Sequence, residues 1–175
     1  MGFIASSDHY STHISYANLI VPATVTTREH LLDAFRNRRT YASTDNIVLD
    51  FSAASTNQGG ELVADRTPEF RINVEGTAPI RSVELIKNNR VVFTREGNGA
   101  DKIAFEFRDI EGFDEVSVGE TATISNWSRP ETGIRPRPDA VERYYYVRVV
   151  QSYSEAEPNK DGEVAWSSPI WVKSR

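Results

Sequence analysis

Residues 47–52 read IVLDFS, and every second side chain in this stretch is large and apolar. Ile47, Leu49 and Phe51 lie on one side of an extended chain, and the residues between them lie on the other. An alternation with a period of two indicates a β-strand with one buried face. Six further stretches carry apolar residues in a similar way: 70–74, 83–85, 91–93, 103–107, 145–149 and 164–172.

These seven stretches predict a mainly β fold, with two packed antiparallel sheets of immunoglobulin or fibronectin type III character. Asn88 and Asn89 tolerate positive φ, so they predict a tight hairpin between two of the strands. The run from Tyr144 to Tyr146 suits the tyrosine-corner strand of such sandwiches. Pro169 removes a ladder donor, which predicts that the last strand is a sheet edge or carries a bulge.

The N-terminal part has a different pattern, which predicts one βα unit. Gly2 to Ser7 is a short stretch of apolar and small residues that indicates a buried strand, and a polar cluster follows from Asp8. Thr26 and Glu29 form a capping box that begins a helix. Since one βα unit cannot bury both of its faces, it needs neighbours.

The predicted helix is amphipathic, with Leu31, Leu32 and Phe35 on one face. Arginines at 36, 38 and 39 crowd its last turn, where the helix dipole favours cations, and we interpret them as a solvated helix end. The chain then divides into residues 1–45, the terminal βα segment of an incomplete domain, and residues 46–175, a β-sandwich domain. Glycines and prolines between residues 109 and 143 predict an insertion with at most short strands.

Composition limits the partners of this chain of 175 residues. Its net charge of −5 argues against binding to nucleic acid, which depends on clustered Lys and Arg. The absence of cysteine excludes disulfides and thiolate ligands. No apolar run reaches the roughly 18 residues that span a bilayer, and the sequence shows no signal peptide. We therefore expect a soluble chain with no membrane partner, and its compartment stays open.

One short segment carries residues that suit a metal. Asp8, His9 and His13 follow the predicted first strand, and carboxylate and imidazole at the end of a strand are suitable ligands for Zn²⁺, Mn²⁺ or Fe²⁺. A loop in which Asp8 caps backbone donors is the alternative on spacing alone. His30 is expected on the surface of the helix.

Two long stretches resemble a known superfamily. GFIASSDHYSTHISYA followed by TREHLLDAFRNRRTYASTDNIVLDF is similar to the end of the PHP (polymerase and histidinol phosphatase) domain in a bacterial branch of that superfamily. YYYVRVVQ and DGEVAWSSPIWV resemble the region that follows the barrel in the same branch. The resemblance implies a barrel with divalent metals at the ends of its strands, which activate water for attack on a phosphoester.

The resemblance maps the last metal motif of the superfamily onto Asp8, with His9 as the next ligand and His13 as a further candidate. Many members have one residue between the Asp and the His, and this sequence has none. The earlier ligands of the superfamily should precede residue 1, so no catalytic residue is assigned here. The resemblance therefore implies the C-terminal part of a metal-dependent phosphoesterase that holds Zn, Mn or Fe when intact, and binds metal weakly or not at all as this chain.

Two other functions stay open. The sandwich could be a binding module for a glycan or a protein, in which Trp127, Trp166 and Trp171 stack on sugar rings, although packing is the more frequent role of such residues. The chain could also be a structural domain that dimerises through the apolar face of its βα unit. The expected partners are accordingly the remainder of its own PHP-like domain, a small phosphoester or a second copy.

Overall fold

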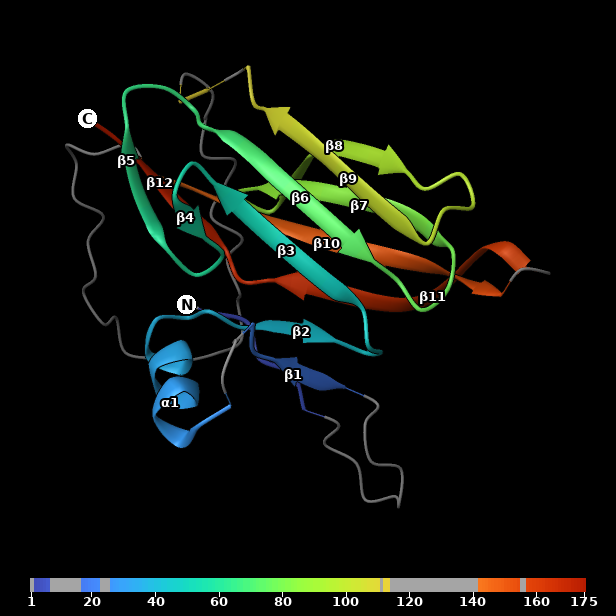
Figure 1. Ribbon diagram of the computed structural model, residues 1–175. Helices are drawn as coiled ribbons and strands as arrows, with labels where there is room; N and C mark the ends of the chain where they lie inside the picture. Colours follow the sequence, from blue (N-terminus) through green and yellow to red (C-terminus); the bar gives the residue numbers. More distant parts are fainter. Residues whose placement is uncertain (1, 7–16, 23–25, 111, 114–141, 155–156) are drawn as a thin grey trace, which may run out of the picture.

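The computed structural model describes residues 2–6, 17–22, 26–110, 112–113, 142–154 and 157–175. These residues form one short helix and twelve strands, so the protein is mainly β (Figure 1). In chain order the elements are β1 (Asn18–Ile20), α1 (Arg28–Arg36), β2 (Tyr41–Ser43), β3 (Val48–Ala53), β4 (Thr56–Asn57), β5 (Glu61–Ala64), β6 (Glu69–Glu75), β7 (Ile80–Lys87), β8 (Arg90–Glu96), β9 (Lys102–Arg108), β10 (Glu142–Ser154), β11 (Glu157–Ser167) and β12 (Ile170–Ser174). No closed barrel occurs in this part of the chain.

The larger sheet has eight strands and is organised around β10. One edge of β10 pairs with β7, which in turn pairs with β8. The other edge pairs first with β12 and then with β11, and β2 and β1 continue the sheet beyond β11. All of these pairs are antiparallel, whereas β12 pairs with β5 in parallel.

The smaller sheet has four strands in the order β4-β3-β6-β9, all antiparallel. Its register places Phe51 opposite Ile72 and Ile72 opposite Phe105, so apolar side chains from three strands share one face. The opposite face is polar: Arg71 pairs with Glu106 across the same strands. This two-sided character is the one that the alternation of the sequence predicts.

One core lies between the sheets. Phe70 of the smaller sheet contacts Tyr145 of the larger one with ring centroids 4.5 Å apart, and both side chains are fully buried. At the flank of the molecule, Phe93 of β8 stacks on Phe107 of β9 at 4.6 Å. The buried residues of this core are Tyr41, Ile47, Leu49, Phe51, Ala53, Phe70, Ile72, Val74, Ile80, Val83, Leu85, Tyr145, Val147, Val149, Ala165, Ile170 and Val172. The predicted core residues between 47 and 85 and between 145 and 149 are thus confirmed.

The predicted hairpin is confirmed, but the predicted last strand is not continuous. Asn88 and Asn89 have φ of 49° and 65° and connect β7 to β8. Ser168 and Pro169 separate β11 from β12, and four residue steps from Ile170 to Trp166 oppose three steps of β10 there, which is the one-residue register shift of a bulge. Because β12 pairs with β10 on one side and β5 on the other, it is an interior strand and the edge prediction was wrong.

The N-terminal predictions need two corrections. Residues 2–6 form no strand, because side chains from elsewhere bind the backbone of Phe3 and no strand pairs with it. The helix cap is Thr27 and not Thr26: its Oγ1 accepts a bond from the backbone N–H of His30. β1 and β2 pair with each other and extend the larger sheet. The division of the chain between residues 45 and 46 stays a prediction. Most of the predicted insertion lies outside the described residues.

The tyrosine-corner prediction was also wrong. The hydroxyl of Tyr145 donates to the carboxylate of Asp109 at 2.8 Å, and not to a backbone carbonyl. Tyr41 is the tyrosine that bonds the backbone, since its hydroxyl donates to the Ile47 carbonyl at 3.0 Å and accepts from the Leu49 N–H at 3.3 Å. Burial raises the pKa of Tyr41, so its hydroxyl keeps the proton that it donates.

Phe70→Ala is expected to lower the free energy of unfolding by about 3–5 kcal/mol, because it empties the contact between the two sheets. Val48→Ala removes an exposed side chain from the outer face of β3 and serves as the control, with an expected change within about 0.5 kcal/mol. Urea unfolding of the two variants measures the difference. Equal losses would contradict a single core between the sheets.

Candidate functional site

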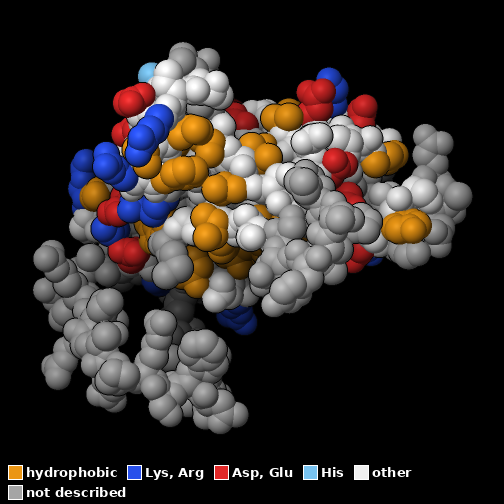
Figure 2. Space-filling view, turned by 90° about the horizontal axis from the view of Figure 1, so that it is seen from below, with side chains coloured by type: hydrophobic (Ala, Val, Ile, Leu, Met, Phe, Trp, Pro, Cys, Tyr) orange, Lys and Arg blue, Asp and Glu red, His pale blue; other side chains and the backbone are white. Residues whose placement is uncertain are grey.

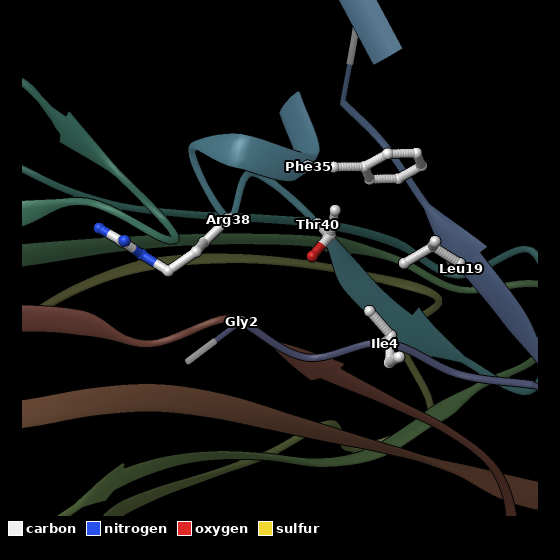
Figure 3. Close-up of a pocket in the computed structure, with 6 residues that line it drawn as sticks. All are labelled: Gly2, Ile4, Leu19, Phe35, Arg38 and Thr40. Carbon is white, nitrogen blue, oxygen red and sulfur yellow. The ribbon is translucent and has the colours of Figure 1, made fainter. Parts of the chain in front are cut away.

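A hollow in the described surface lies where the N-terminal residues meet α1. It has a volume of about 300 Å³. Figure 3 shows Phe35 of α1 and Leu19 of β1 pointing towards each other on one side of it, with Thr40 between the two elements. The lining residues are Gly2, Ile4, Leu19, Phe35, Arg38 and Thr40. Since few polar groups face this hollow, it suits an apolar group better than an ion.

Residues 2–6 reach this position because the sandwich binds their backbone. The Phe3 N–H donates to Ser168 Oγ at 2.8 Å, and Thr40 Oγ1 donates to the Phe3 carbonyl at 2.8 Å. A side chain at Gly2 would approach Arg38 Cβ to 3.0 Å, so the chain is close to the end of the helix here. Residues 2–6 are therefore held in place although they belong to no strand.

The ring of Phe3 packs on a row of aromatic residues on the outer face of the larger sheet. Its centroid lies 5.5 Å from that of Tyr146 and 6.5 Å from that of Trp166, edge to face in both cases. Arg148 covers Trp166 from another direction, with its guanidinium carbon 5.3 Å from the ring centroid. Burial raises the pKa of Tyr146, whose side chain is only 8% exposed. Trp166 thus serves packing, while Trp127 lies outside the described residues.

Helix α1 covers very little of the sandwich. Ala34 is its one buried residue, and Leu32 and Phe35 are 40% and 44% exposed. Leu31, the third residue of the predicted apolar face, is half-buried, so this face is only partly covered. Ile4, which the sequence placed in a buried strand, is 76% exposed beside it.

Arg38 is not the solvated helix end that the sequence predicted. Its φ of 58° places it in the left-handed region, where the chain turns from α1 towards β2. Its Nε donates to the Gly59 carbonyl at 2.9 Å, and its guanidinium lies 5.1 Å from the ring centroid of Trp171. A side chain at Gly59 would come within 2.2 Å of the Arg38 carbonyl oxygen, so the close contact requires glycine. Arg38 therefore fastens the end of α1 to the sandwich.

Two other arginines of α1 form no ion pair with the described residues. Arg39 pairs with Asp33, but Arg28 and Arg36 are exposed and have no ion-pair partner among the described residues. Figure 2 shows hydrophobic side chains gathered over the middle of this side of the molecule, with Lys and Arg along one margin. The surface is apolar at its centre, and its margin carries both basic and acidic side chains.

The predicted metal ligands Asp8, His9 and His13 lie outside the described residues, so they stay a prediction. Within the described ranges no three His, Asp or Glu side chains gather in a way that could hold a metal ion. His30 is exposed on α1 as expected, with its Nδ1 2.7 Å from the Thr27 hydroxyl. The helix α1 is also neither long nor apolar enough to cross a membrane, and it is the one helix in this part of the chain.

A second group of titratable side chains is buried at one end of the sandwich. Lys87 Nζ lies 2.7 Å from Asp109 Oδ2, and the same oxygen accepts the hydroxyl of Tyr145. Lys87 also donates to the Gly112 carbonyl at 2.8 Å. Burial, followed by the bond to Asp109, raises the pKa of Tyr145, which stays a donor. With Lys87 and Asp109 only 5% and 3% exposed, the group joins the two sheets and is closed to a ligand.

Sequence reasoning missed Leu19, Thr40 and Ser168. Leu19 belongs to the apolar run of residues 19–21, a signal for the short strand β1 that was present in the sequence. Thr40 and Ser168 gave no such signal, because a buried hydroxyl that binds a distant backbone looks like any other polar residue in a sequence. Their importance comes from the separation in the chain, 37 and 165 residues, of the groups that they bind.

Comparison with known proteins finds homologues in Chlamydia. An uncharacterised protein of Chlamydia trachomatis serovar D is 32% identical over 152 residues, one of Chlamydia muridarum is 30% identical over 152, and one of Chlamydia pneumoniae is 32% identical over 155. Each match covers 83% of this chain but only 21% of the relative, so the chain spans about a fifth of their length. No family model and no solved structure matches the chain.

Lys87→Met is expected to destabilise the protein by about 3–5 kcal/mol, because it removes the ammonium group that lies 2.7 Å from the buried Asp109 carboxylate. The double variant Lys87→Met, Asp109→Leu should recover at least half of that loss, since it removes both charges. Urea unfolding of the three proteins tests this. A double variant less stable than Lys87→Met would show that Asp109 acts mainly through other bonds.

Arg38→Ala should cost about 1–2 kcal/mol through the loss of the bond to Gly59 and the contact with Trp171. Arg36→Ala, on the exposed side of the same turn, is the matched control and should change stability by less than about 0.5 kcal/mol. Thermal unfolding distinguishes them. If both variants shift the unfolding temperature by the same small amount, Arg38 contributes no more than a solvated residue at the end of a helix.

Proposed function

We propose that this chain is a non-catalytic β-sandwich part of a longer metal-dependent hydrolase, in which it holds the segment that bears the last metal-ligand motif. The observation that carries this proposal is the fixing of Phe3 by Ser168, Thr40 and the aromatic row. Ser6, the end of the held segment, is two residues from Asp8. A rigid support next to a ligand matters because a metal site requires its ligands in a defined geometry.

The proposal places the chemistry mainly outside this chain. Asp8, His9 and His13, which are close together in the sequence, offer at most three ligands, whereas transition-metal sites usually have four or more. The remaining ligands would come from other parts of the polypeptide, and the greater length of the Chlamydia relatives is consistent with such parts. A Zn, Mn or Fe ion bound there would supply an activated water for hydrolysis of a small phosphoester.

A glycan-binding module is the second candidate, and the aromatic row favours it. Tyr144 and Tyr146 are stacked with centroids 6.4 Å apart, and Tyr146 continues to Trp166 at 6.1 Å. Such a row could stack on sugar rings. Phe3 already covers the end formed by Tyr146 and Trp166, and for this reason we favour the supporting role.

Metal binding tests the proposal. The chain of 175 residues should bind Zn²⁺ or Mn²⁺ no tighter than about micromolar and should not hydrolyse a generic phosphoester, because its ligand shell is incomplete. The polypeptide encoded by the complete gene should retain metal through gel filtration and lose it on Asp8→Ala, whereas His30→Ala should have no effect. Calorimetry, metal analysis and the phosphoesterase assay provide the readouts. Tight stoichiometric binding with turnover by the short chain would refute the partial site.

A further inference from the structure

The exposed apolar face of α1 is a feature of the described surface that the fold does not account for. A helix of nine residues is not stable by itself in water, and amphipathic helices usually gain their stability by burying an apolar face. Here Leu32 and Phe35 remain exposed and Ala34 alone is buried. The cap at Thr27 and the attachment of Arg38 fix the ends of the helix, but neither covers its apolar side.

The exposed residues of α1 are continuous with the hollow beside it. Phe35 belongs both to the helix face and to the lining of the hollow. Ile4, from residues 2–6, and Leu19, from β1, also line the hollow (Figure 3). We call the surface made by Ile4, Leu19, Leu32 and Phe35 the α1 face. Its centre is apolar and concave, which is the form of a surface that receives a protruding apolar group.

We propose that the α1 face docks an apolar element with acidic residues at its margin, from another part of the same, longer polypeptide. The proposal rests on the proposed function, because it requires that polypeptide. The acidic margin follows from Arg28 and Arg36, which are exposed beside the α1 face without an ion-pair partner in the described part of the chain. Carboxylates of the docked element would satisfy them and set its orientation.

Two arguments favour the same polypeptide over a second copy of this chain. The matched region is about a fifth of each Chlamydia relative. The remaining four fifths of such a protein could contain the docked element. A linked element also acts at a high effective concentration, which allows a modest apolar surface to stay occupied.

Hydrogen exchange of the amides in α1 is the test. It is compared between the chain of 175 residues and the polypeptide that the complete gene encodes. We expect exchange in α1 to be at least about tenfold slower in the complete polypeptide, because docking must break before the helix can open. Equal rates would overturn the proposal, as would a complete gene that encodes no more than these residues.

Variants separate docking from general stability. In the complete polypeptide, Phe35→Asp should return the exchange of α1 to the rate of the short chain, and Phe35→Leu should leave it slow. Val91→Asp, at an exposed position of β8, is the matched control and should have no effect. Arg36→Glu should speed exchange in α1 as well. The protection of β10 reports that each variant still folds, and an unchanged α1 in folded Phe35→Asp would contradict the docking.

Two more measurements distinguish the alternatives. Light scattering of the short chain should show a monomer, and a dimer that Phe35→Asp dissociates would overturn the proposal in favour of a second copy. The metal content of the complete polypeptide is determined in the same samples. Slow exchange in α1 without bound metal would leave docking standing and reject the hydrolase, whereas bound metal with fast exchange would do the reverse.

Discussion

The backbone ladder of β10 is the constraint on which the rest of the structure depends. This strand has thirteen residues and is paired along both of its edges, with β7 on one side and with β12 and then β11 on the other. Since every neighbour of β10 in turn pairs with another strand, all eight strands of the larger sheet take their register from it. The smaller sheet then packs on the face that this register creates, through the contact of Phe70 with Tyr145.

The two faces of β10 connect the core to the candidate site. One face of β10 points into the core and carries the fully buried Tyr145, Val147 and Val149. The other face carries Tyr146, which belongs to the outer aromatic row, and Arg148, which packs on Trp166 of that row. The packing of Phe3 on this row fixes residues 2–6, and their position creates one wall of the hollow beside α1. A change in the register of β10 would thus disturb both the core and the N-terminal segment, because successive side chains of a strand face opposite ways.

The described part of the protein contains a buried ion pair and an open apolar hollow. Its buried ion pair of Lys87 and Asp109 is closed to solvent and joins the sheets, and the hollow beside α1 is lined mainly by apolar side chains. The α1 face, with Arg28 and Arg36 at its margin, and residues 2–6, which lead to Asp8, lie on the same side of the molecule. Both proposals therefore concern what this side contacts, and they need no catalytic group from the sandwich.

The sequence by itself determined the strands of the core and their inward faces, together with the hairpin at Asn88 and Asn89, because alternation and turn preferences act over a few neighbouring residues. It also identified Ile4 and Phe35 as apolar residues of the N-terminal part, although not their exposure. Only the tertiary structure decided that β12 pairs in parallel with β5, that Arg38 binds Gly59, and that Thr40 and Ser168 hold Phe3. These contacts join groups between 21 and 165 residues apart, and no local pattern encodes which distant backbone a polar side chain will meet once the sheets have packed.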